Sequence, residues 1–282
     1  IFKIEKLKGE SYELKYKIHN QNKINTIKSK KVFIGAGGMA ISLLQNIGIK
    51  KVKGYAGYPL SGEWLICNKK EIIKQHRSKV YSQPFPGAPT MSIPHLDHRV
   101  IGNQEKILFG SFASFTTKFL KYGSKWDFFR SIKLNNISSL FIIFLKNMPL
   151  LKYLICQSFM SHRKKINQLK KFYPIANSRD WHTESAGQRV QIIKKTSNGV
   201  SLEFGTEVLY SSKKNLASLI GASPGASTSC SLMLDVALNI YDDPKLLAKI
   251  KKILPFYDLK LNENPKILRR MRSNVYKKLK LV

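Results

Sequence analysis

Twice in this sequence an apolar strand, a glycine-rich turn and a helix follow one another directly, and this arrangement constrains the fold most. In the first of these segments, the apolar stretch 31–34 precedes the turn 35–38. Residues 39–47 then have helical apolar spacing, and Gly48 is placed to end the helix. Such a turn lets the backbone approach a cofactor. Its candidate cofactor-binding residues are Gly35, Gly37 and Gly38.

The second turn, 221–228, follows a predicted strand at 215–220 and leads into another helix. Gly221 and Gly225 carry no side chain, so main-chain N–H groups can reach a ligand. The helix N-terminus also presents partial positive charge to an anion or an electron-rich ring. An ordinary tight strand-to-helix turn has the same pattern, so both interpretations stay open. The candidate cofactor-binding residues are Gly221, Ala222, Ser223, Gly225, Ala226, Ser227 and Thr228.

The strong positive charge of the chain, +32, allows three interpretations. It fits a nucleic-acid-binding protein, a protein held at an anionic membrane surface, or a compositional bias toward lysine. The cations are spread along the chain without a dense basic block, which favours the bias with some membrane attraction. The longest apolar segment, 139–155, is interrupted by Lys146 and Lys152, and predicts either a buried core helix or an interfacial helix.

A predicted hairpin carries the first candidate catalytic group. Its strands are 95–101 and 106–112, joined by 102–105. Side chains alternate along a strand, so His95, Asp97 and Arg99 share one face. Histidine can take a hydroxyl proton near neutral pH, and arginine can hold a carboxylate with two hydrogen bonds. A solvent-facing strand with a local Asp97–Arg99 ion pair explains the same residues.

Other elements are predicted with less chemistry attached. The opening residues alternate as two strands of a meander, residues 119–172 are mainly helical, and 201–210 is a strand. Arg189, at the start of an apolar strand, can clamp a carboxylate or lie on the surface. The three cysteines form no paired motif and indicate neither a disulfide nor a metal site.

Several longer segments occur in an order that resembles the malate:quinone oxidoreductase family. They are 32–38, 57–62, 87–89 with 91–97, 186–191, 204–207 and 221–228. The resemblance implies an α/β fold of mixed α+β character. In it, an FAD-binding domain of the glutathione-reductase and amino-acid-oxidase type is interleaved with a mixed-sheet substrate domain.

The resemblance also implies a division of the chain. Residues 1–50 would be the middle of the FAD-binding domain, 51–200 the substrate domain, and 201–282 the C-terminal part of the FAD-binding domain with a basic tail. The glycine-rich motif that binds the ADP half of FAD in the family is not present here. We therefore expect a C-terminal fragment that does not hold FAD tightly alone.

By the same resemblance, the complete enzyme would be malate dehydrogenase (quinone) of the tricarboxylic acid cycle. Arg99 and Arg189 would hold the carboxylates of malate, and His95 would take the hydroxyl proton. Electrons would pass through FAD to a membrane quinone, without a metal, on the cytoplasmic face of the inner membrane. There the protein would bind peripherally to the anionic surface. The alternatives are oxidation of lactate or 2-hydroxyglutarate, an inactive remnant, and a basic nucleic-acid-binding protein.

Overall fold

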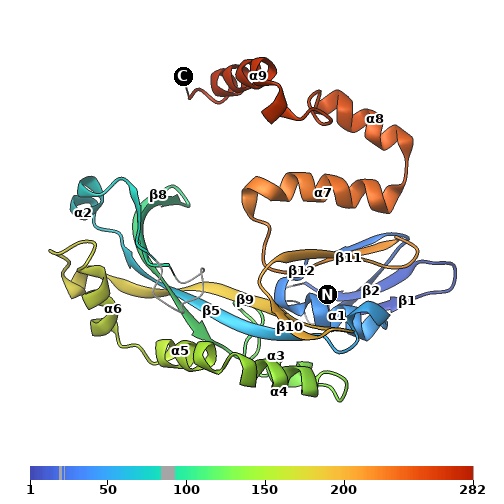
Figure 1. Cartoon of the computed structure of the whole chain (residues 1–282), viewed down its shortest axis with the longest axis horizontal. Helices are drawn as coiled ribbons and strands as arrows, with labels where there is room; N and C mark the ends of the chain where they lie inside the picture. The colour runs from blue at the N-terminus through green and yellow to red at the C-terminus, as the bar shows by residue number, and fades with distance from the viewer. Residues whose placement is uncertain (19–20, 22, 84–92, 282) are drawn as a thin grey trace. The chain divides into compact units, whose positions relative to one another are not determined.

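A computed structural model of the chain describes residues 1–18, 21, 23–83 and 93–281 (Figure 1). These residues form two compact units, Ile1–Gly225 and Ala226–Val282. The first unit contains three β-sheets and most of the helices, so the predicted mixture of sheet and helix is confirmed. The proposed division at residues 50 and 200 stays a prediction.

The N-terminal sheet is an antiparallel meander of three strands, β1 (Lys3–Lys6), β2 (Tyr12–Lys17) and β3 (Ile24–Ser29). The sequence pattern predicted β1 and β2 but missed β3. The reason is that Ile24 and Ile27 are spaced by three residues and are both 54% exposed, so β3 lacks the alternation of a half-buried strand.

A small mixed sheet joins distant parts of the chain. Its order is β11 (Thr206–Tyr210), β12 (Leu216–Gly221) and β4 (Val32–Ile34), with β4 parallel to β12. The turn after β4 enters a short 3-10 helix, Gly37–Met39, and then α1 (Ala40–Ile47). Gly48 ends α1 in the left-handed conformation, at φ 83°, as its position predicted.

The largest sheet has six strands, and every neighbouring pair in it is antiparallel. Its order is β10 (Gly199–Glu203), β9 (His182–Thr196), β5 (Ala56–Cys67), β8 (Gln104–Phe115), β7 (His95–Ile101) and β6 (Lys79–Tyr81). The predicted hairpin is β7 and β8, and the bounds of β7 are confirmed. The predicted strand 201–210 is wrong, because it breaks at Phe204 and Gly205 into β10 and β11 of different sheets.

Helices α3 to α6 cover the large sheet along one side (Figure 1). They are α3 (Asp127–Ser131), α4 (Ile137–Lys146), α5 (Met148–Ser158) and α6 (His162–Leu169), and α2 (Lys70–Gln75) lies after β5. The mainly helical character predicted for 119–172 is confirmed. One core packs Leu140, Ile143 and Leu154 against the sheet, and a second packs Ile166 and Leu169.

The second unit is helical. It contains α7 (Gly225–Tyr241), α8 (Pro244–Ile253) and α9 (Pro265–Lys278), except that Gly225, the first residue of α7, belongs to the first unit. On α7, Val236 and Ile240 are buried. The basic tail forms α9, in which no residue is buried.

Candidate active site

One cavity of about 430 Å³ is lined by all three residues that the sequence nominated for catalysis: His95, Arg99 and Arg189. His95 and Arg99 come from β7, whereas Arg189 comes from β9. Two strands, β5 and β8, lie between them in the sheet. Chain positions about ninety residues apart therefore contribute to one hollow.

Small residues on the intervening strands leave room for this cavity. Gly187 of β9 is opposite Gly62 of β5, and Gly62 is opposite Ala113 of β8. All three line the cavity. Side chains of directly opposed residues point to the same face of a sheet, so this row of two glycines and an alanine forms a low floor between the larger side chains of β7 and β9.

His95 is held in one orientation by contacts on several sides. Its Nδ1 lies 2.9 Å from the backbone oxygen of Ile93. Its ring stacks on Tyr81 with centroids 4.6 Å apart, and the ring of Trp64 meets it edge-on at 4.9 Å. When Nδ1–H donates to the Ile93 carbonyl, the neutral imidazole carries its lone pair on Nε2. The geometry therefore assigns Nε2 as the atom that can accept a proton.

Arg99 is oriented by a buried carboxylate. Asp97 is fully buried, and its Oδ2 accepts a hydrogen bond from Arg99 Nε and lies 3.3 Å from Lys79 Nζ. The Arg99 guanidinium also lies 5.3 Å from the centre of the Trp64 ring. The bond through Nε leaves the terminal amino groups to bind a carboxylate end-on. The predicted Asp97–Arg99 pair is present, but the expectation of a solvent-facing strand is wrong for Asp97.

Arg189 and its neighbour Gln188 complete the opposite wall. Arg189 is exposed, and Gln188 is half-buried. Within the described part of the chain, Gln188 Oε1 is buried without a hydrogen-bond partner. A buried amide oxygen without a partner costs free energy, so a bound molecule that donates a hydrogen bond to it would be stabilised.

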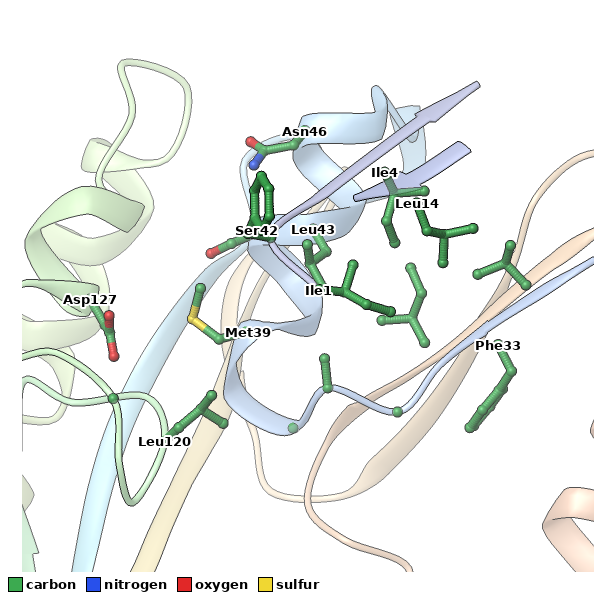
Figure 2. Close-up of a pocket in the computed structure, with 17 residues that line it drawn as sticks. Ile1, Ile4, Leu14, Phe33, Met39, Ser42, Leu43, Asn46, Leu120 and Asp127 are labelled. Carbon is green, nitrogen blue, oxygen red and sulfur yellow. The ribbon is translucent and has the colours of Figure 1, made fainter. Parts of the chain in front are cut away.

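The first glycine turn lies elsewhere. Gly35 and Gly37 line a separate, mostly apolar hollow of about 780 Å³, around which Figure 2 shows Ile4, Leu14 and Leu43. Gly38 has a packing role, because a Cβ there would collide with Val190 and Phe119. The structure therefore does not bring these glycines into the cavity of His95.

The second glycine turn is shaped by its own contacts. Gly221 has φ 79°, and a Cβ would lie 2.5 Å from the backbone oxygen of Gly205. Ala222 N donates to that same oxygen at 3.0 Å. Ser223 Oγ accepts from Gly225 N at 3.4 Å, and Gly225 has φ 71° with no heavy atom within 4 Å of a Cβ. Packing thus explains Gly221, whereas Gly225 faces open space. Three further candidates belong to the second unit: Ala226, Ser227 and Thr228.

Comparison with known proteins decides the family. The family model described as malate:quinone oxidoreductase matches residues 1–281. The chain belongs to the malate:quinone oxidoreductase family. The sequence segments that resemble the family lie within the described residues, except 87–89, Met91 and Ser92.

Relatives within the malate:quinone oxidoreductase family are similar over most of this chain. A probable malate:quinone oxidoreductase of Prochlorococcus marinus (strain MIT 9211) is 46% identical over 88% of this chain and 50% of its own length. One from Exiguobacterium sp. is 45% identical over 94% of this chain and 54% of its own length. The chain therefore spans about half the length of these relatives. An FAD-dependent oxidoreductase from Pseudomonas aeruginosa aligns over 80% of this chain and 48% of its own, with 8% identity and a TM-score of 0.35.

Some residues of the cavity were not nominated from the sequence. Trp64 and Gln188 line it. Gln188 stood beside Arg189 in a family-like segment, which was the available signal. The roles of His95, Arg99, Arg189 and the glycines stay predictions.

Proposed function

We propose that the protein oxidises (S)-malate to oxaloacetate and that its electrons pass through FAD to a membrane quinone. The observation that supports this most is the cavity that His95 shares with Arg99 and Arg189. Membership of the malate:quinone oxidoreductase family agrees with it.

The residues of the cavity suit a 2-hydroxydicarboxylate. Malate carries two carboxylates, and two guanidinium groups from opposite walls, Arg99 and Arg189, can pair with one each. A hydroxyl between them would face the imidazole, and His95 Nε2 would take its proton. The two arginines favour malate or 2-hydroxyglutarate over lactate, which has a single carboxylate.

The redox step needs a group that accepts hydride. Bound FAD would supply this chemistry by taking the hydride from C2 and delivering two electrons to quinone. Gln188 Oε1 fits such a group, because a flavin ring carries an N–H that can donate to an unpaired oxygen. Gly225, with open space around its Cα, would let the main chain approach the cofactor. The other cofactor-binding candidates are proposals in the same way: Gly35, Gly37, Gly38, Gly221, Ala222, Ser223, Ala226, Ser227 and Thr228.

The cellular setting is also part of the proposal. We propose peripheral attachment to the anionic cytoplasmic face of the inner membrane, where quinone is available, and a place in the tricarboxylic acid cycle. The net charge of +32 supports attraction to anionic lipid.

Substitutions in the native gene product test the chemistry. His95→Ala should lower kcat with malate roughly 10²–10⁴-fold, the usual range for a positioned general base. Arg189→Ala should raise KM, and Arg189→Lys should restore binding only in part because lysine lacks the planar guanidinium. FAD content, measured by absorbance, should be unchanged in each variant. Normal kinetics of His95→Ala with FAD bound would place the base elsewhere.

A further inference from the structure

Helix α4 has apolar residues on its buried side and also on a side that is exposed in the described part of the chain. Leu140 and Ile143 are buried in the core beneath the large sheet. Ile137, Phe141 and Leu145, spaced four residues apart, are 54%, 64% and 54% exposed. A helix whose outer side faces water normally carries polar residues there. The outer side of α4 therefore has the composition of a surface that meets an apolar partner.

The neighbouring helix and loops extend this surface. Phe128 of α3 is buried and contacts the ring of Phe144 on α4, with centroids 6.1 Å apart. On the other side of α3, Trp126 and Phe129 are 63% and 51% exposed and contact each other at 5.6 Å. Leu134, in the loop between α3 and α4, is 97% exposed. Inner residues pack toward the sheet, so these outer aromatic and aliphatic groups point away from it.

The charges around this surface are almost all positive. From Lys106 to Arg179 the sequence contains one acidic residue, Asp127. Asp127 Oδ2 is engaged within the protein, where it accepts a hydrogen bond from Phe119 N at 3.2 Å. The exposed cations of α3 to α5 and the preceding loop are Lys121, Lys125, Arg130, Lys146 and Lys152. Apolar groups fringed by lysine and arginine complement a lipid surface with anionic headgroups.

We propose that the outer surface of α3 to α5 is where the protein docks on an anionic lipid bilayer. Phe141, Leu145 and Trp126 would enter the boundary between headgroups and acyl chains, while the lysines contact phosphates. Within the described residues, no single helix is long and apolar enough to cross a membrane. Only α4 and α5 together pass that test, and they are bent by 85° at the break between them. Docking in the plane of the surface needs no spanning segment.

This inference refines the membrane attachment proposed above, and its test does not depend on malate chemistry. The native gene product is mixed with phosphatidylglycerol vesicles and, separately, with phosphatidylcholine vesicles, and the bound fraction is measured by sedimentation. The double variant Phe141→Ser/Leu145→Ser should bind phosphatidylglycerol at least tenfold more weakly. The matched control, Ile24→Ser/Ile27→Ser, removes two side chains that are each 54% exposed on β3 and should bind as the native protein does.

The charge of the surface is tested in the same assay. Lys146→Gln should weaken binding to phosphatidylglycerol by about fivefold, and raised salt should weaken binding of the native protein. Binding to phosphatidylcholine should be weak for every variant.

The outcomes separate the lipid from other partners. Equal vesicle binding by the double variant and its control would overturn the proposal. The proposal would also be overturned if the double variant bound vesicles normally but had a lower oligomeric state or melting temperature. A second copy of the chain, or another part of the protein, would then cover the surface. Malate oxidation with a soluble dye should persist in the double variant. If the native protein oxidised no malate, the proposed activity would fail while the binding result would stand.

Discussion

The buried carboxylate of Asp97 provides the sharpest test of how the candidate site is organised. Asp97 is fully buried and binds Arg99 through Nε, while Arg99 itself is 40% exposed. Asp97→Asn keeps the shape of the side chain but removes its charge. We expect Arg99 to lose its fixed orientation, so that it holds a malate carboxylate less well.

The magnitude follows from the bond that is lost. A hydrogen bond to a charged group contributes about 1.5–3 kcal/mol. Each 1.4 kcal/mol is a factor of about ten in an equilibrium constant. Loss of the whole contribution would lower kcat/KM by roughly 10- to 150-fold. Because solvent screens the exposed part of Arg99, we expect the lower end of this range, mainly as a higher KM.

The assay is steady-state oxidation of malate with a soluble electron acceptor, together with FAD content and melting temperature. Lys79→Met is the matched control. Lys79 lies 3.3 Å from the same Asp97 oxygen but is 51% exposed, and its removal leaves the bond to Arg99 intact. A normal KM for Asp97→Asn, or an equal effect of Lys79→Met, would refute the positioning role of Asp97.

Three further predictions concern stability. In the described part of the chain, the Tyr58 hydroxyl is buried without a partner, and burial raises the pKa of its phenol to about 12. Tyr58→Phe should therefore raise the free energy of unfolding, measured by urea titration, by about 1 kcal/mol. A decrease would reveal a partner for the hydroxyl. Gly221 has φ 79°, and an added Cβ would meet the backbone oxygen of Gly205. Gly221→Ala should therefore lower the free energy of unfolding by about 1–3 kcal/mol or more in the same titration. An unchanged free energy would mean that the turn can relax. The hydrogen bond to Glu207 raises the pKa of Lys194, so their pair stabilises the fold at neutral pH and this contribution disappears as alkaline pH deprotonates the lysine. Lys194→Met should therefore lower the free energy of unfolding by about 0.2–1 kcal/mol at pH 7. In thermal melts, the difference in stability between variant and native protein should shrink above the raised pKa of Lys194. A difference that stays constant with pH would point to lost packing instead.

The hairpin of the candidate site shows how far sequence patterns reach. Strand β7 was predicted at its observed bounds, but β8 begins at Gln104, two residues earlier than predicted. The turn consists of Gly102 and Asn103, which both have positive φ, as a two-residue hairpin turn requires. Gln104 and Glu105 looked like loop residues because they are polar. They are opposite Ile101 and Val100 at an exposed end of the sheet, where alternation no longer marks a strand.

Strand breaks depend on tertiary structure in a way that local patterns do not record. Alternating residues continue from β10 into β11, yet the two strands join different sheets. In the same way, the apolar segment 139–155 becomes two helices that meet at Asn147. Leu154 is buried there, whereas Phe141 is largely exposed, so the segment is neither wholly a core helix nor wholly a surface helix.

The candidate site required both local and long-range information. The period of two along a strand was enough to place His95 and Arg99 on one face, and β7 keeps them there. Nothing in that period brings Arg189 to them, because the order β9-β5-β8-β7 is a property of the whole sheet. The low floor of Gly187, Gly62 and Ala113 arises only once the register aligns three strands. A glycine in one strand has many explanations. Small residues aligned across three neighbouring strands leave a cavity open between β7 and β9. Arg99 and Arg189 line this cavity from its two sides, which is the basis for proposing that they bind one dicarboxylate.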